Sequence, residues 1–277
     1  MPRATAETEV PFRPKSDVGF YAALAILSGI YIALIVLMLL ADAIYTTPGT
    51  LWAALDSPEI RYAIALSLLS CTMTTVLSMW FAVAIGYVMS RFEFRGKVVL
   101  DAVLDIPIVL PPLVIGLSLL ILFRFPPFHW ISHWVVYEIP AVILAQLLLA
   151  CAFAVRTMRT TFDQIPLRQE QVAMTLGCSR GQAFWLITLP QAESGMLAAA
   201  TLAWARALGE FGPILIFAGS TRLRTEVLPT TVFLEMQAGN LKAALAVSMI
   251  MVIAALVTLI VARVFGHRKS ILSGGPV

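Results

Sequence analysis

The chain has 277 residues, of which 60% are hydrophobic and 13% charged, and its net charge is +3. Soluble domains carry roughly 25% charged residues, so a deficit of this size excludes a surface that mostly faces water. Cys71, Cys151 and Cys178 fall in or near apolar segments without metal-like spacing, and we interpret them as buried apolar side chains or free thiols. The composition predicts an integral membrane protein, surrounded by a lipid bilayer and not bound to nucleic acid.

Six apolar runs are long enough to cross a bilayer. A spanning helix needs about 20 apolar residues, because the hydrocarbon layer is about 30 Å thick and a helix rises about 1.5 Å per residue. The runs are residues 18–41, 62–90, 106–123, 139–155, 194–221 and 243–262. The first run exceeds a signal-peptide core of about 7–15 residues, so we expect it to be retained as a span. The six runs therefore predict an all-α membrane protein with six transmembrane helices.

The distribution of Lys and Arg predicts the orientation, because cytoplasmic loops carry the excess of these residues. With a cytoplasmic N-terminus, thirteen of the 19 lie inside, five lie outside, and Arg206 lies within a run. Both termini are therefore predicted to be cytoplasmic. The expected organisation is a cytoplasmic arm at 1–17, a transmembrane domain at 18–265 and a cytoplasmic tail at 266–277.

Enzyme and metal chemistry find little support in the sequence. No Gly-x-x-x-x-Gly-Lys-Ser/Thr run is present, so we expect the chain to bind no triphosphate, and no nucleophile, base and acid set stands out. His129 and His133 are four apart, as two metal ligands on one helix face would be, with Glu138 as a nearby third. An aromatic belt at the outer membrane surface, with Trp130 and Trp134, explains them better. We predict no catalytic residue, no metal site and no cofactor bound by this chain.

The third apolar run is interrupted by prolines. Pro107, Pro111 and Pro112 fall within six residues, and Gly116 follows. Proline removes a backbone donor and clashes with the preceding turn, and in a bilayer the freed carbonyls must find neighbouring helices or water. One interpretation is a bent helix beside a cavity, with Pro111, Pro112 and Gly116 near a path through the membrane. The other is a packing kink without such a role.

The fifth run contains two ionisable residues, Arg206 and Glu210. Charges inside a membrane are costly and usually face a bundle interior or water, and residues four apart can pair on one helix face. The pair either fixes helix packing or, with Gly209, Phe211 and Gly212, belongs to a path or its gate. If both charges are poorly solvated, removing one should cost about 3–5 kcal/mol.

The inside segment at about 165–190 reads as a short helix, a turn and a return to the membrane. Val172, Ala173 and Leu176 form an apolar stripe at helical spacing. Gly177 is suited to stop that helix with a positive φ, and Pro190 can begin the next one. Such a segment would present a helical knob to a cytoplasmic partner, although it could also merely join two helices.

This segment resembles the coupling loop of binding-protein-dependent ABC import permeases. That family has Glu-Ala-Ala, three residues, Gly, nine residues and then Ile-x-Leu-Pro. Four positions match at the expected spacing: Gly177, Ile187, Leu189 and Pro190. The Glu-Ala-Ala positions instead hold Gln171, Val172 and Ala173, and Glu170 is displaced by one residue. The resemblance implies that Gln171, Val172, Ala173 and Leu176 belong to the part that meets the ATPase.

Two further segments resemble the molybdate, tungstate and sulfate permeases of that family. One is Asp105-x-Pro107 with Pro111-Pro112 and Gly116, and the other is residues 205–212, Ala-Arg-Ala-Leu-Gly-Glu-Phe-Gly. The resemblance implies a type I importer permease in the cytoplasmic membrane of a bacterium or archaeon. It also implies a second permease copy, in a homodimer or a pseudo-dimer. Its other implied partners are two cytoplasmic ATPase subunits, which bind ATP and Mg, and an extracytoplasmic solute-binding protein.

The leading hypothesis is therefore a permease for a tetrahedral oxyanion, with molybdate or tungstate ahead of sulfate. A small dianion needs donors along its path, so we expect Gly, Ser, Thr and backbone groups there rather than acids. Within the same family, phosphate, iron, thiamine or a sugar remain alternatives. A secondary transporter, which inverted repeats would favour, and a membrane-embedded enzyme are the alternatives from other classes.

Overall fold

A computed structural model of the chain describes residues 18–272, so the predicted arm at 1–17 and the last five residues of the predicted tail lie outside the described part. The chain divides into two units, Met1–Tyr45 and Thr46–Val277. Every regular element in the described residues is a helix. This agrees with the predicted all-α class.

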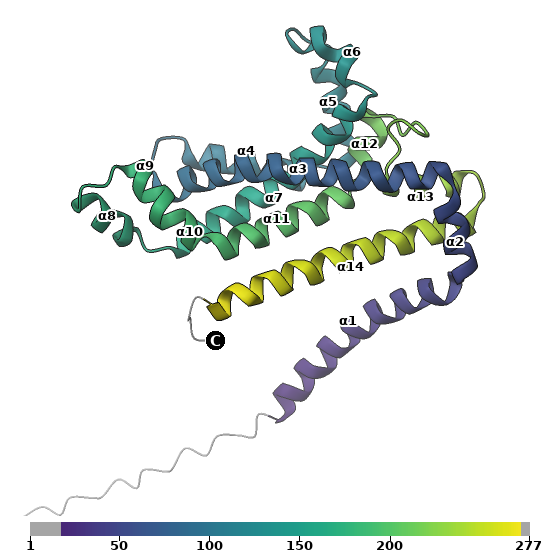
Figure 1. The fold of residues 1–277 in the computed structure, drawn as a ribbon, viewed down its shortest axis with the longest axis horizontal. Coiled ribbons are helices and arrows are strands. Elements are labelled where there is room, and N and C mark those ends of the chain that lie inside the picture. Colours follow the sequence, from purple (N-terminus) through teal and green to yellow (C-terminus); the bar gives the residue numbers. More distant parts are fainter. Residues whose placement is uncertain (1–17, 273–277) are drawn as a thin grey trace, which may run out of the picture. The chain divides into compact units, whose positions relative to one another are not determined.

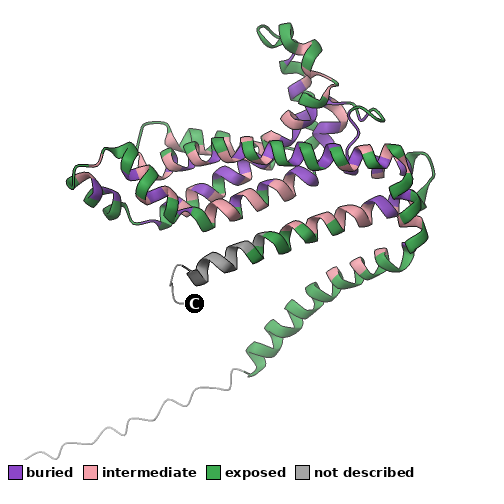
Figure 2. Cartoon of the chain, viewed as in Figure 1, coloured by how far each residue is buried: buried purple, intermediate pink, exposed green. Residues whose placement is uncertain are grey.

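The first unit contains one long helix, α1 (Val18–Tyr45). Its 28 residues suffice to cross a bilayer at about 1.5 Å per residue, and none of them is buried (Figure 2). A helix with apolar side chains exposed all round would be unstable in water but is well solvated by lipid. The predicted first span is thus confirmed as a helix, which extends four residues beyond residue 41.

The second unit is built from α-helices with short connections (Figure 1). They are α2 (Pro48–Asp56), α3 (Pro58–Arg91), α4 (Lys97–Val109), α5 (Pro112–Leu122), α6 (Ser132–Val135), α7 (Ile139–Gln164), α8 (Leu167–Thr175), α9 (Arg180–Ala183), α10 (Leu189–Gln191), α11 (Glu193–Leu208), α12 (Gly212–Phe217), α13 (Leu228–Gln237) and α14 (Leu241–Leu272). A 3-10 turn at Phe128–Ile131 precedes α6, and a π-helical turn at Phe184–Thr188 joins α9 to α10.

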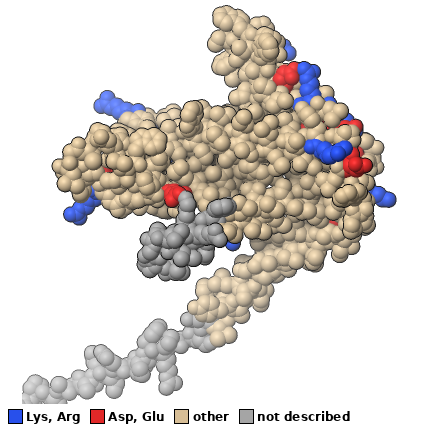
Figure 3. Space-filling model, in the orientation of Figure 1, with Lys and Arg blue, Asp and Glu red and all other residues tan. Residues whose placement is uncertain are grey.

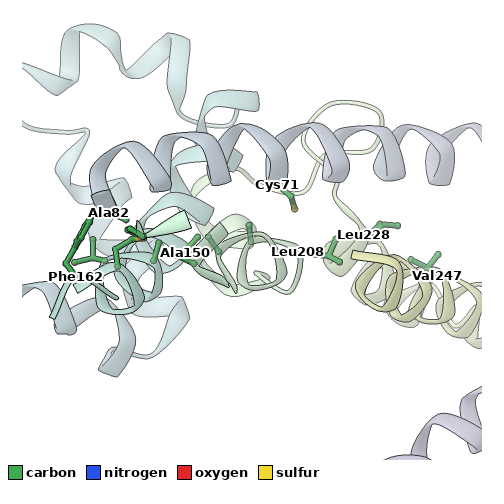
Figure 4. Packing of buried hydrophobic residues seen from close by; sticks show 14 of the residues in the cluster. Cys71, Ala82, Ala150, Phe162, Leu208, Leu228 and Val247 are labelled. Atoms are coloured by element: carbon green, nitrogen blue, oxygen red, sulfur yellow. The ribbon is translucent and has the colours of Figure 1, made fainter. Parts of the chain in front are cut away.

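The core of the second unit lies where α3, α7 and α11 pack side by side. Small side chains dominate these contacts, and Figure 4 shows Ala82 of α3, Ala150 and Phe162 of α7, and Leu208 of α11 within one apolar cluster. Gly86 of α3 approaches α7 so closely that an added Cβ would lie 3.0 Å from the backbone nitrogen of Arg159. Small residues let helices approach in a membrane, where no hydrophobic force drives them together.

Four helices in the described part are long and apolar enough to cross a membrane, namely α1, α3, α7 and residues 241–261 of α14. The pair α4 and α5 adds a fifth if it counts as one span, although it is bent by 112°. The expectation that the run at 194–221 is a single helix is wrong, because α11 ends at Leu208 and α12 begins at Gly212. Pro213 explains this break, since it has no N–H to donate to the Gly209 carbonyl four residues earlier and its ring would clash with that carbonyl in a continuous helix.

Charged side chains are segregated in the second unit. Figure 3 shows most of the Lys, Arg, Asp and Glu residues of the visible face near the two ends of this unit, with a broad band of other residues between them. Exposed large apolar side chains on α3, α5 and α14 occupy that band. This pattern suits a protein whose middle section is solvated by hydrocarbon chains and whose ends meet water.

Candidate functional site

The segment at residues 165–190, here called the coupling segment, begins with the predicted short helix α8 and its predicted stop. Gly177 has a φ of 95°, in the left-handed region that favours glycine, and nothing lies within 4 Å of a Cβ built there. The Cys178 N–H donates to the Ala173 carbonyl at 3.1 Å and so closes the turn. Ser179 and Gln182 then form a capping box that starts α9.

The predicted apolar stripe on α8 divides between outside and inside. Leu176 is 82% exposed and Val172 is 50% exposed, whereas Ala173 is only 4% exposed. Successive residues on a helix point about 100° apart, so Ala173 faces a different direction from Val172 and Leu176. The side of α8 that carries Ala173 packs against the rest of the chain, whereas Val172 and Leu176 point outward. Ala173 thus offers little surface of its own, and its predicted part in the contact with a partner stays a prediction.

Other residues of the coupling segment are also accessible. Gln171 and Pro190 are exposed, and Ile187 and Leu189 are half-buried. Trp185, in the π-helical turn of the same segment, is also exposed. A shallow groove of about 590 Å³ lies between α8 and the end of the segment, lined by Pro166, Arg168, Gln169, Val172, Ile187 and Gln191.

Glu170 anchors the coupling segment to the end of α3. This buried carboxylate accepts hydrogen bonds from Arg91 Nε at 2.8 Å, Tyr87 Oη at 3.0 Å and Thr188 Oγ1 at 2.8 Å. Arg91 Nη2 also donates to the Ile165 carbonyl at 3.0 Å. Tyr87 and Arg91 of α3 thus hold the beginning and the first helix of the segment, and Glu170 itself holds Thr188 near its end. Sequence reasoning noted Glu170 only as a displaced acid and missed its partners.

The proline-rich and charged segments predicted to line a path lie against each other. A Cβ added to Gly116 of α5 would lie 2.8 Å from Pro213 Cα of α12, and one added to Gly212 would lie 2.8 Å from Pro112 Cβ. We call residues 110–116 and 209–213 the paired breaks, because each interrupts a helical run and the two are in backbone contact. Pro111 lies at the start of α5 and is exposed, as is Gly209 at the end of α11.

Arg206 and Glu210 form the predicted ion pair at the second of these breaks, with 3.8 Å between Arg206 Nη2 and Glu210 Oε2. The Glu210 side chain is 3% exposed, whereas the Arg206 side chain is 40% exposed. The Arg206 guanidinium also lies over the ring of Phe153, 5.1 Å from its centroid, a cation–π geometry. The accessible charge at this break is therefore positive. Phe211, the next residue, is half-buried and packs on Phe233.

His129 and His133 do not share a regular helix. His129 lies in the 3-10 turn, His133 lies in α6, and both are exposed beside the exposed rings of Trp130 and Trp134. Within the described residues, no group of three His, Cys, Asp or Glu side chains could hold a metal ion.

The fold and these sites define a class of protein: a multi-pass helical membrane permease with interrupted helices in contact and a structured segment between spans. Residues 82–270 match the family described as "Binding-protein-dependent transport system inner membrane component", and the chain belongs to that family. Its members are permease subunits of ABC importers and not enzymes in themselves.

Known relatives share about a third of their residues with this chain. The "Sulfate transport system permease protein CysT" of Escherichia coli is 30% identical over 213 residues, which cover 75% of this chain and 77% of the relative. The "Molybdenum transport system permease protein ModB" of Mycobacterium bovis is 33% identical and covers 89% of this chain and 94% of its own length. The "Molybdate/tungstate transport system permease protein WtpB" of Pyrococcus abyssi is 37% identical over 59% of this chain and 63% of its own.

The fold itself has a solved counterpart. A chain in the crystal structure of a bacterial ABC transporter involved in the import of the acidic polysaccharide alginate aligns with a TM-score of 0.71. The alignment covers 91% of this chain and 96% of that one at 18% identity, so the likeness concerns the fold alone. A second structure of such a transporter, in complex with an alginate pentasaccharide-bound periplasmic protein, aligns with a TM-score of 0.70.

Proposed function

We propose that this permease carries a tetrahedral oxyanion inward, with molybdate or tungstate ahead of sulfate. The observation that carries the proposal is that the relatives at 30–37% identity are named for sulfate, molybdenum and molybdate/tungstate transport. The charge at the paired breaks supports it, because Arg206 is accessible there while Glu210 is withdrawn. Apart from Glu210, the paired breaks contain only glycine, proline and apolar residues, so no other acid stands there to repel a dianion.

Uptake by the reconstituted complex tests the cargo. The chain, purified with the ATPase and binding protein that travel with it, should move labelled molybdate or tungstate into proteoliposomes when ATP is present on the ATPase side. Sulfate should compete, and a neutral sugar should neither compete nor enter. Transport of a sugar without any oxyanion would refute the cargo.

We further propose six spans with both termini in the cytoplasm, in the cytoplasmic membrane of a bacterium or archaeon. Each interrupted run then counts as one span, and the inside excess of Lys and Arg supports the orientation. The domain boundaries would be those of the sequence, with the transmembrane domain at 18–265. Reporter fusions after residue 48 and after residue 270 should report outside and inside respectively, and the opposite pattern would overturn this topology.

The coupling segment is proposed to receive a cytoplasmic ATPase subunit, which binds the ATP and Mg that this chain is not expected to bind. The support is the outward position of Val172, Leu176 and Trp185, since a few apolar anchors carry most of the affinity when a helix enters a partner's groove. A solute-binding protein outside the membrane and a second, identical permease copy complete the proposed complex. A periplasmic protein is present in one of the similar structures.

The positive φ of Gly177 allows a matched test of this coupling role. Gly177→Val should strain the turn by about 1–3 kcal/mol and displace Leu176, because a β-branched residue disfavours the left-handed region. Gly181→Val is the control, since Gly181 lies in the same segment, has equally free surroundings and lacks a positive φ. We expect the first variant to insert and fold but to bind the ATPase weakly or uncouple hydrolysis from uptake. Normal association and uptake would show that the segment only joins two helices.

A further inference from the structure

A buried polar cluster connects α3, α7 and the break at the end of α11. Gln146 of α7 is 2% exposed and Thr74 of α3 is fully buried. Thr74 Oγ1 donates to Gln146 Oε1 at 3.1 Å, and Gln146 Nε2 donates to the Ala207 carbonyl at 3.1 Å. One glutamine side chain therefore joins three helices, and its Nε2 also lies 3.7 Å from Cys71 Sγ of α3.

The break changes the donors to the Ala207 carbonyl and leaves room for one from another helix. In a continuous helix this carbonyl would accept from the N–H of Phe211, four residues on. Because α11 ends at Leu208, the N–H of Glu210 donates instead, at 3.2 Å, and Gln146 supplies the second donor. A carbonyl freed by a helix break inside a membrane is costly unless neighbouring side chains or water satisfy it.

We infer that Gln146 is a positioning residue for transport: its amide holds the Ala207 carbonyl and thereby fixes the direction in which residues 209–212 leave α11. Ala207 lies directly beside Arg206 and three residues before Glu210, so a rotation at this carbonyl would move both charges of the pair. The Thr74 hydroxyl fixes the amide in turn, because it occupies Oε1 and leaves Nε2 facing Ala207. The inference rests on the proposed function, which gives this break a part in the path.

Replacing Gln146 by leucine tests whether the amide matters. Gln146→Leu keeps most of the side-chain volume but removes the hydrogen-bond donor. We expect the maximal rate of molybdate uptake per folded complex to fall about tenfold, which corresponds to about 1.4 kcal/mol for the lost hydrogen bond. The substrate concentration at half-maximal rate should change little. A role limited to folding would lower the amount of complex on size-exclusion chromatography and leave the rate per complex unchanged.

Replacing Gln146 by glutamate gives a second readout that does not depend on how well the leucine variant folds. A carboxyl group can donate to the Ala207 carbonyl only when it is protonated, because a carboxylate only accepts hydrogen bonds. Uptake by Gln146→Glu, divided by wild-type uptake at the same pH, should therefore rise as the pH falls from about 8 to about 5.5. The same variant-to-wild-type ratio should be measured for the ATP hydrolysis that the binding protein stimulates. This second measurement does not require the cargo to be identified correctly.

Ser78→Ala is the matched control for this cluster. Ser78 is fully buried on the same helix as Thr74, but its hydroxyl has no hydrogen-bond partner, so its removal should leave uptake unchanged. Thr74→Val should lower uptake by less than Gln146→Leu. Wild-type rates in Gln146→Leu, or a Gln146→Glu ratio that does not change with pH, would overturn the inference. A wild-type complex that moves no oxyanion would instead refute the proposed cargo.

Discussion

The coupling segment and the paired breaks are held in place by opposite kinds of contact. Around Glu170, a charged side chain collects donors from residues far apart in the chain. At Gly116 and Gly212, two backbones touch because side chains are missing. The contacts of the coupling segment need particular charged and polar side chains. The contact between the paired breaks needs glycines, which have no side chain. Close packing of small residues replaces charge inside a bilayer, whereas ionic contacts suit the chain outside it.

The largest expected effect comes from removing the carboxylate that anchors the coupling segment. Glu170→Ala leaves the Arg91 guanidinium, whose side chain is 7% exposed, without its counter-charge, and this should cost about 3–5 kcal/mol. We expect a clearly lower melting temperature in detergent and weaker association with the ATPase. Gln171→Ala is the control for the melting temperature alone, because Gln171 is the exposed neighbour of Glu170 on the same helix. Equal melting temperatures for the two variants would contradict the anchoring role.

A smaller effect is expected from adding a side chain at the paired breaks. Gly212→Ala places a Cβ 2.8 Å from Pro112 Cβ and 3.1 Å from the backbone nitrogen of Leu113, atoms that cannot move aside alone, and overpacking of this kind costs about 1–3 kcal/mol. At Gly209 the nearest atom to an added Cβ is 3.7 Å away, so Gly209→Ala should be tolerated. The yield of folded protein and the uptake rate of both variants measure the difference. Equal behaviour would show that the breaks are free to separate.

The parts of this structure that sequence could predict are those with a local cause. Uninterrupted apolar runs predict α1, α3, α7 and α14, because a bilayer demands length and hydrophobicity from each helix separately. The positive φ at Gly177 follows from a glycine at the end of a short apolar stripe. The contact between Arg206 and Glu210 follows from helical spacing.

The parts that sequence missed depend on residues distant along the chain. Arg91 and Glu170 are 79 residues apart, and no periodicity connects them. The burial of Ala173 depends on what packs against α8, and the donor to the Ala207 carbonyl comes from another helix. The break between α11 and α12 did have a local signal in Gly212-Pro213, but the apolar run around it concealed that signal.

The smallest expected effect is the coupling between Arg206 and Glu210. From the sequence alone the pair should be worth about 3–5 kcal/mol, but that estimate assumes that both charges are poorly solvated. The Arg206 side chain is 40% exposed and the pair is 3.8 Å long, so we expect a coupling of about 0.5–1 kcal/mol.

A double-mutant cycle for the free energy of unfolding, with Arg206→Gln, Glu210→Gln and both together, measures this coupling. The single variants should differ, because Arg206→Gln leaves a carboxylate that is 3% exposed without its partner, whereas Glu210→Gln leaves a cation that is 40% exposed and still lies over the Phe153 ring. Arg206→Gln should therefore be the more damaging change, and the double variant should recover part of its cost. Strictly additive losses would show that the two charges do not interact, and a more damaging Glu210→Gln would show that the guanidinium is the poorly solvated partner.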